Sequence, residues 1–149
     1  MASIEIDDAE ILRVLRRLQD ASSYLRPALL EIGEDLVEST KQRFETSTAP
    51  DGSDWLLNSA LSTLLYKAGD KPLVDGGTLS HQINKDVTGD TLEVGSTMEY
   101  AAMQQFGGTK EEFPYLWGDI PARPFLGVSQ EDKDNILAVL NRHIEAVLR

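Results

Sequence analysis

The side chains best suited to chemistry are two histidines, His81 and His143, in a chain rich in carboxylates. His81 lies between Asp75 and Asp86, so a carboxylate–histidine pair there would offer the acid–base chemistry of a small hydrolase. His143 lies beside the apolar positions of a predicted C-terminal helix, where a hydrogen-bonded or solvent-facing histidine is the commoner arrangement. The sequence has no HExxH spacing, no paired histidines and no cysteine, so neither histidine predicts a metal site.

Other patterns with known chemistry are incomplete. The run Asp51-Gly52-Ser53-Asp54 lacks the alternating oxygen ligands and closing glutamate of a calcium loop, and a polar turn explains it. The pairs Gly76-Gly77 and Gly107-Gly108 stand outside the GxxxxGK[ST] and GxGxxG frames that cradle phosphates. No serine occupies a GxSxG elbow. We therefore expect no catalytic residue, no cofactor and no metal.

Length and charge narrow the class of protein. The chain has 149 residues, of which 41% are hydrophobic, and this predicts a single domain over residues 1–149. No apolar run approaches the roughly 20 residues of a membrane span, and Met1–Glu10 is acidic, unlike a secretory signal. The absence of cysteine fits a protein made in the cytoplasm. A net charge of −11 repels nucleic acid and suits solubility, a basic partner, or DNA that slides past without adhering.

Three long helices are predicted, over residues 8–20, residues 24–46 and from about 130 to the C-terminus. Apolar residues recur in each at spacings of three and four, which defines one buried face per helix. Their expected caps are Asp7 or Asp8, Ser22 or Ser23, and Ser129 or Asp132. The expected buried faces are Ile11, Leu15 and Leu18; Leu25, Leu29, Ile32, Leu36, Thr40 and Phe44; and Ile136, Leu140, Ile144, Val147 and Leu148. Gly33 interrupts the second helix, which either a close contact or ordinary drift would explain.

A β-hairpin is predicted over residues 83–96. Apolar and polar residues alternate on both sides of Gly89-Asp90, and a two-residue loop there places Val87 opposite Leu92 and Lys85 opposite Val94. The fold class is therefore α+β, with long N-terminal helices and a C-terminal helix packed on a small antiparallel β-sheet that contains the 83–96 hairpin. Shorter helices are expected over residues 58–68 and 99–106, an aromatic-rich binding loop over 108–119, and an extended edge segment over 120–128.

Three ordered groups of short motifs are more specific than any of these patterns. They are Pro50-Asp51-Gly52 with Trp55; Tyr66-Lys67 followed by the run from Pro72 to Leu79 and by Ile83; and Val94-Gly95-Ser96 leading to Tyr100-Ala101, Gln105-Phe106-Gly107-Gly108 and the run from Ile120 to Gly127, IPARPFLG. In order and spacing, from about Phe44 to about Ile136, the chain resembles the phage virion morphogenesis family, which includes tail completion proteins. Two positions depart from the family pattern. Gln104 stands where the family tends to carry histidine, and the segment from Asp75 to Leu79 resembles the family's Thr-Gly-x-Leu pattern with Asp75 and Gly76 at its start. These departures leave the subfamily and the binding partners open.

The resemblance implies a structural protein rather than an enzyme, made in the bacterial cytoplasm and located in the virion at the head–tail neck or tail end. It implies a homo-oligomeric ring, with a hexamer as one expected form, that contacts head-connector or tail-tube and terminator proteins and surrounds DNA without reading its sequence. Acidic side chains are expected to line the lumen. The interface candidates are Trp55, Tyr100, Gln105, Phe106, Trp117, Arg123, Pro124 and Phe125. For Phe125 core packing is an equal expectation, and for Arg123 a salt bridge is favoured over a DNA contact.

Two other classes of function stay open. An acidic protein of this kind can act as a DNA mimic that occupies a basic host protein, which predicts carboxylates clustered on one face. A small hydrolase centred on His81 and its neighbouring aspartates is the other reading. Loss of activity in a His81→Ala variant would distinguish the hydrolase, and a soluble host partner would distinguish the DNA mimic.

Overall fold

The computed structural model describes residues 2–3, 8–22, 24–55, 82–96, 101–109, 111–112 and 122–148. Several sequence predictions lie outside the described residues. They are the helix over 58–68, the site around His81, the aromatic loop around Trp117, and the side chain of Tyr100.

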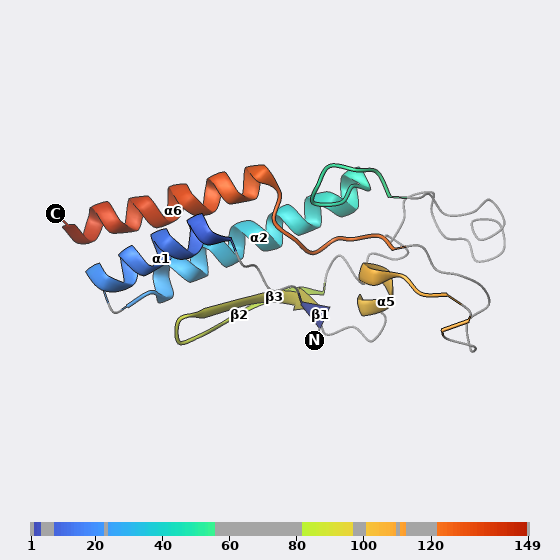
Figure 1. Ribbon diagram of the computed structural model, residues 1–149, viewed down its shortest axis with the longest axis horizontal. Helices are drawn as coiled ribbons and strands as arrows, with labels where there is room; N and C mark the ends of the chain where they lie inside the picture. The colour runs from blue at the N-terminus through green and yellow to red at the C-terminus, as the bar shows by residue number, and fades with distance from the viewer. Residues whose placement is uncertain are drawn as a thin grey trace.

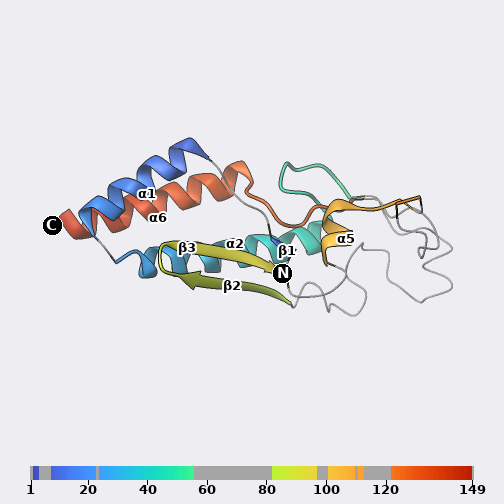
Figure 2. The same cartoon turned by 60° about the horizontal axis from the view of Figure 1, so that its bottom comes forward.

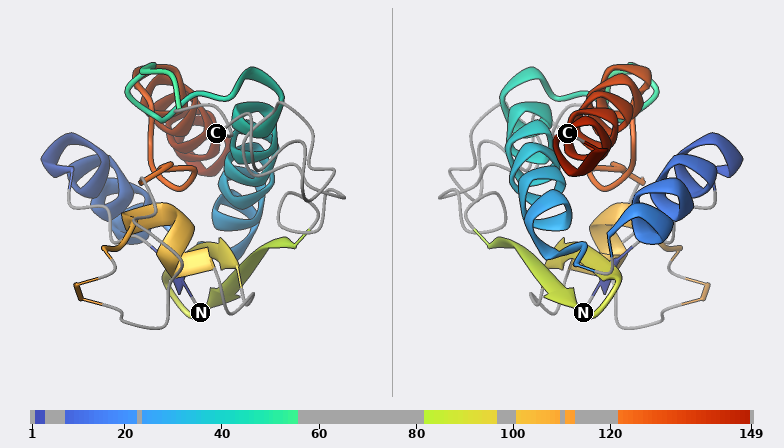
Figure 3. Two further views of the ribbon diagram at one scale, coloured as in Figure 1. Left: turned by 90° about the vertical axis from the view of Figure 1, so that its right-hand side faces the viewer. Right: turned by 90° about the vertical axis from the view of Figure 1, so that its left-hand side faces the viewer.

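Three long helices form the larger part of the described structure. Helices α1 (Ala9–Ala21) and α2 (Arg26–Thr46) both pack against α6 (Gln130–Leu148), and α2 also packs against the hairpin. In Figures 1 and 3, α2 therefore lies between α6 and the sheet, while α1 covers the other flank of α6. The predictions of all three helices are confirmed. None of the described helices is long and apolar enough to cross a lipid bilayer.

Two of the three predicted helix caps are confirmed. The Asp8 side chain accepts hydrogen bonds from the backbone N–H groups of Glu10 and Ile11 at the start of α1. At the start of α6, Ser129 Oγ accepts from the N–H of Asp132 while Asp132 Oδ2 accepts from the N–H of Ser129, a reciprocal capping box.

The predicted serine cap of α2 is wrong. This helix has Leu25 at its N-cap position and no side-chain cap. Proline in its first turn has no N–H group, so one fewer donor needs a partner there.

The sheet has strand order β1-β3-β2, with β1 (Ala2–Ser3), β2 (Ile83–Thr88) and β3 (Thr91–Ser96) all antiparallel. The predicted register is confirmed, because Val87 pairs with Leu92 and Lys85 with Val94 across the Gly89-Asp90 loop. Figure 2 shows the hairpin running alongside α2. The face away from the helices carries exposed polar residues, as the alternation predicts: Asp86, Thr88, Thr91 and Glu93.

Buried side chains form two clusters at opposite ends of α2. The first joins α1, α2 and α6 through residues such as Leu18, Leu29 and Leu140, and the second surrounds Phe44. The predicted buried stripe of α6 holds through Ile144, but Val147 and Leu148 are exposed, which corrects the prediction. The C-terminal end of α6 extends past α1 in Figure 1, so α1 does not cover its last turn.

Gly33 marks a close contact between α2 and the hairpin, which was one of its two expected explanations. A Cβ atom built at this position would lie 2.9 Å from Leu92 Cδ1 and 2.9 Å from Lys85 Cδ. Both atoms belong to the outer parts of flexible side chains, and Leu92 borders a cavity into which it can shift. The position therefore tolerates one added carbon better than three.

We expect Gly33→Ala to change the free energy of unfolding by less than about 1 kcal/mol, since the helix propensity gained offsets the displacement of Leu92 and Lys85. Gly33→Val adds a branched side chain at a packed contact and should lower that free energy by about 1–3 kcal/mol. Urea unfolding measures both values. Asp35→Val, at an exposed position of the same helix, is the control for the poor helix propensity of valine. Equal losses in the two valine variants would contradict the close contact.

Candidate functional site

Residues from the separate sequence motifs converge around one segment of the chain. Trp55, Gln105, Phe125 and Leu126 are all buried, and three of them belong to the cluster that surrounds Phe44. Residues 122–127, called the 122–127 segment below, form no strand or helix. The extended edge segment predicted over 120–128 therefore pairs with no strand at residues 122–128, and residues 120 and 121 lie outside the described residues. Side chains from other segments bond to the backbone groups of Pro124, Phe125 and Leu126.

Gln105 makes the most extensive of these contacts. It lies on the short helix α5 (Ala101–Phe106), which ends before Gly107, a glycine with φ of 71°. Its Oε1 atom accepts hydrogen bonds from the backbone N–H groups of Phe125 at 3.0 Å and Leu126 at 2.9 Å. Its Nε2 atom donates to the carbonyl of Leu126 at 3.2 Å. A single buried amide thus satisfies three backbone groups that would otherwise be unpaired in the interior.

Trp55 holds the same segment from the opposite side. The indole Nε1 donates to the carbonyl of Pro124 at 2.8 Å. The Trp55 ring meets Phe44 edge to face with ring centroids 5.5 Å apart, and Phe44 packs on Phe125 at the same distance. Edge-to-face aromatic contacts of this kind stabilise beyond the area they bury. The loop that carries Trp55 is thereby joined to the 122–127 segment.

A buried ion pair provides a third support. Arg43 Nη2 lies 2.5 Å from Asp132 Oδ2, and both side chains are 6% exposed. Arg43 Nη1 also donates to the carbonyl of Phe125 at 2.8 Å. Burial lowers the pKa of Arg43, and the negative charge of Asp132 opposes that shift. Arg43 therefore ties α2 both to the 122–127 segment and to the first turn of α6.

The ion pair between Arg43 and Asp132 was not predicted from the sequence. Asp132 was recognised only as a candidate cap, and Arg43 was not singled out. The available signal was a basic residue beside Phe44, at the edge of an otherwise apolar helix face.

The interface candidates fall into three groups. Trp55, Gln105 and Phe125 are buried within their own chain. Arg123 and Pro124 are half-buried, and Phe106 is 67% exposed. Tyr100 and Trp117 lie outside the described residues. An interface role stays a prediction for all the candidates, and Phe106, Arg123 and Pro124 are those with exposed or half-exposed surface among the described residues.

Arg123 lies at the junction between the segment and α5. Its backbone N–H donates to the carbonyl of Gln104 at 2.8 Å. Burial lowers the pKa of its guanidinium, so part of the side chain is removed from water. The position suits a planar cation that packs against the protein and presents its donors at one edge.

His143 and Asp51, two of the residues examined for chemistry in the sequence, bond to other side chains of the chain. His143 Nε2 lies 3.0 Å from Glu31 Oε2, and Arg142 pairs with the same carboxylate, so the expectation of a hydrogen-bonded histidine is confirmed. Asp51 accepts from the N–H and hydroxyl of Ser53, which lowers the pKa of the carboxyl and fits the predicted polar turn. Across the described part of the chain, no group of three His, Cys, Asp or Glu side chains could hold a metal ion.

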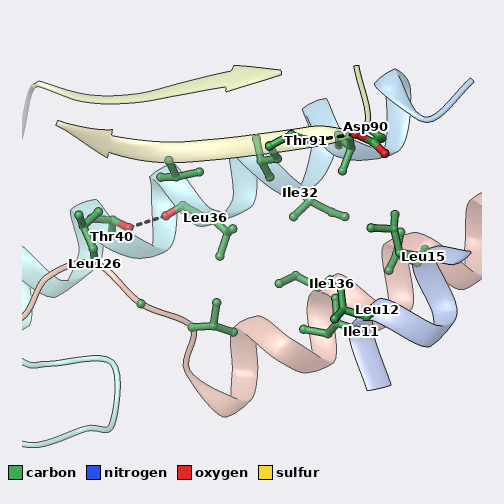
Figure 4. A pocket seen from close by; sticks show the side chains of 16 residues that line it. Ile11, Leu12, Leu15, Ile32, Leu36, Thr40, Asp90, Thr91, Leu126 and Ile136 are labelled. Atoms are coloured by element: carbon green, nitrogen blue, oxygen red, sulfur yellow. Dashed lines mark hydrogen bonds between the residues drawn. The ribbon is translucent and has the colours of Figure 1, made fainter. Parts of the chain in front are cut away.

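An apolar cavity of about 400 Å³ lies between the helices and β3 (Figure 4). Leucine and isoleucine side chains from α1, α2 and α6 dominate its walls, and Asp90 is the one charged residue among those lining it. The Thr40 hydroxyl bonds to the carbonyl of Leu36 in its own helix, so it offers no free donor to a ligand. The walls contain no acid–base pair.

The family match and the two relatives described next all come from phages or prophages. The family model described as the phage virion morphogenesis family matches residues 6–145. The chain is 30% identical over 150 residues to Mu-like prophage FluMu G protein 2 of Haemophilus influenzae, with all of both chains covered. It is 34% identical over 121 residues, 76% of each chain, to the putative capsid assembly protein G of Escherichia phage Mu.

No solved structure matches the chain significantly. The family model nevertheless covers the chain from before α1 to residue 145 in the last turn of α6. It contains every residue described above as holding the 122–127 segment in place. On the extent of that match and of the full-length relative, the chain belongs to the phage virion morphogenesis family.

Proposed function

We propose that this protein completes the tail end or head–tail neck of a tailed phage as a ring of identical subunits around the DNA path. The observation that carries the proposal is the 122–127 segment, which buried side chains from three other segments hold in one conformation. A segment ordered before association loses less conformational entropy when it binds. The family motifs thus build a firm support for a contact surface and not a reaction centre.

The surface beside that segment has the chemistry of a protein–protein contact. Phe106 follows Gln105 directly and exposes two-thirds of its surface, although it is a large apolar residue. Arg123 and Pro124 are half-buried, and the backbone N–H of Arg123 bonds to the carbonyl of Gln104, two residues before Phe106. Aromatic and arginine side chains are the types enriched in interface centres. Head-connector, tail-tube or terminator proteins, or a second subunit, would bind here.

The net charge of −11 supports the remaining part of the proposal. DNA that moves through a ring must not adhere to it, and carboxylates along the lumen would repel the phosphates weakly. A ring structure with a neutral or basic lumen would refute this part.

The decisive experiment is to measure the mass of the purified chain by light scattering and to look for the chain in purified virions and assembly intermediates. The proposal expects a closed oligomer under at least one condition and the chain in particles. A strictly monomeric chain that is absent from particles and intermediates would overturn it, and would favour the DNA-mimic alternative if a basic host protein co-purified.

Phe106→Ser should weaken assembly and leave folding intact. Because the side chain is exposed, the free energy of unfolding should change by less than about 0.5 kcal/mol. If Phe106 anchors a contact, association should weaken by about 2 kcal/mol, or roughly 30-fold. Tyr24→Ser is a matched control, because Tyr24 is also an aromatic residue with 67% exposure but lies at the start of α2. Equal effects on assembly in the two variants would remove Phe106 from the interface.

A further inference from the structure

Two oppositely charged surfaces of this chain form no ion pair with its own described residues. The first is the arginine face of α1, made of Arg13, Arg16 and Arg17, all of which are exposed. The second is the acidic seam between α2 and α6, made of Asp35, Glu38 and Glu131, which line one hollow and are also exposed. None of the six side chains makes an ion pair with the described part of the chain.

The arginine face is unusual for so acidic a protein. Three of its eight arginines fall within little more than one turn of α1, although carboxylates outnumber Lys and Arg by 25 to 14. Three other surface cations pair with carboxylates: Lys85 with Glu34, Lys133 with Asp8 and Glu10, and Arg142 with Glu31. Exposed Arg26 and Lys41 make no ion pair with the described residues either, but they stand singly and do not form a cluster. Arginine also differs from lysine in that its planar guanidinium binds a carboxylate through two parallel hydrogen bonds. An unpaired arginine cluster therefore fits a partner that presents carboxylates.

The chain itself presents such carboxylates, on the other side of α6. In the end-on views of Figure 3, α1 lies on one flank of α6 and α2 on the opposite flank. The acidic seam lies along the α2–α6 junction, so one molecule cannot bring its own seam onto its own arginine face. A second copy can do so.

We propose that neighbouring subunits associate by placing the arginine face of α1 of one copy on the acidic α2–α6 seam of the next. The inference rests on the ring of the proposed function and specifies its contact. A two-fold contact through the arginine face would set arginine against arginine, which is repulsive. Joining two different surfaces leaves the pair with one free arginine face and one free acidic seam, and repetition of that contact closes a ring when the rotation permits.

The test uses three charge-reversed forms of the full chain. The first carries Arg13→Glu, Arg16→Glu and Arg17→Glu; the second carries Asp35→Lys, Glu38→Lys and Glu131→Lys; the third carries all six. We expect each triple variant to weaken self-association at least about 100-fold, because like charges then face each other. The variant with all six substitutions should recover the oligomer, because the two surfaces are again oppositely charged, with their signs exchanged. Native mass spectrometry and light scattering at several concentrations measure the oligomer.

The set contains its own control for total charge. The acid-to-lysine triple changes the net charge from −11 to −5, so it would associate better than the natural chain if overall repulsion were decisive. The proposal expects the opposite. Circular dichroism establishes that each variant is folded. Any charge-reversed variant that unfolds is replaced by neutral substitutions. These are Arg13→Gln, Arg16→Gln and Arg17→Gln on the arginine face, and Asp35→Asn and Glu38→Gln on the acidic seam.

The outcomes separate this inference from the function on which it rests. The proposed contact would be overturned, and the ring itself left intact, by either of two results. One is that rings persist when the three arginines are replaced by glutamate; the other is that the variant with all six substitutions is folded but stays monomeric. Rings that form normally but no longer complete virions would assign the arginine face to another protein or to DNA, and would also overturn it. A natural chain that is monomeric at every concentration would remove the ring and the contact together.

Discussion

Replacing Arg43 by methionine is expected to lower the free energy of unfolding by about 3–5 kcal/mol, since it leaves a buried carboxylate without its cation. Arg43 and Asp132 are each 6% exposed and lie 2.5 Å apart, so water cannot take the place of the lost partner. The variant also loses the hydrogen bond to the carbonyl of Phe125. The 122–127 segment should then loosen together with the first turn of α6.

The double variant with Asp132→Asn distinguishes the charge from the packing. Asparagine keeps an oxygen that can accept from the N–H of Ser129, so the helix cap can survive while the charge is removed. Arg43→Met with Asp132→Asn should therefore cost less than the sum of the two single changes, with an interaction energy of about 1–3 kcal/mol. Strict additivity would contradict a buried, coupled pair.

Arg142→Met is the matched surface control. Arg142 also pairs with a carboxylate, that of Glu31, but its side chain is 60% exposed. Exposed ion pairs contribute only about 0–1 kcal/mol, so this variant should unfold at nearly the concentration of urea that unfolds the natural chain. A comparable loss at both positions would show that arginine side-chain packing, rather than burial of the charge, determines the stability.

The elements of this fold could be predicted because their signals are local. A period of three to four residues indicated α1, α2 and α6, and strict alternation around Gly89-Asp90 indicated the hairpin and its register. The same periodicity overextended the buried face of α6 to Val147 and Leu148, because a residue pattern does not show where a neighbouring helix ends.

The contacts that build the candidate site could not be predicted in the same way. Arg43 and Asp132 are separated by 89 positions, and Gln105 binds backbone groups about 20 positions away. Such contacts leave no periodic trace in the sequence. Trp55, Gln105 and Phe125 were chosen as interface candidates by residue type, and residue type alone does not distinguish a surface anchor from a buried support. The three-dimensional structure adds that each of these side chains is buried within its own chain.

Gln105→Leu should be the other strongly destabilising change. Leucine has a similar volume but no polar atoms, so the N–H groups of Phe125 and Leu126 and the carbonyl of Leu126 lose their partner together. Each unpaired buried backbone group costs about 1–3 kcal/mol, so we expect the free energy of unfolding to fall by about 3 kcal/mol or more. Urea unfolding measures the loss, and amide hydrogen exchange at Phe125 and Leu126 locates it.

The adjacent residue offers an unusually close control. Gln104 lies on the same helix, but its Oε1 atom is buried and has no hydrogen-bond partner among the residues that the structure describes. Gln104→Leu removes an unpaired polar atom and should leave stability unchanged or slightly raised, although the chemical change is identical. The difference between the two variants therefore measures the three hydrogen bonds of Gln105 and not the effect of leucine on a short helix. Equal losses at the two positions would mean that the 122–127 segment keeps its conformation without Gln105, and its preorganisation for assembly would then need another cause.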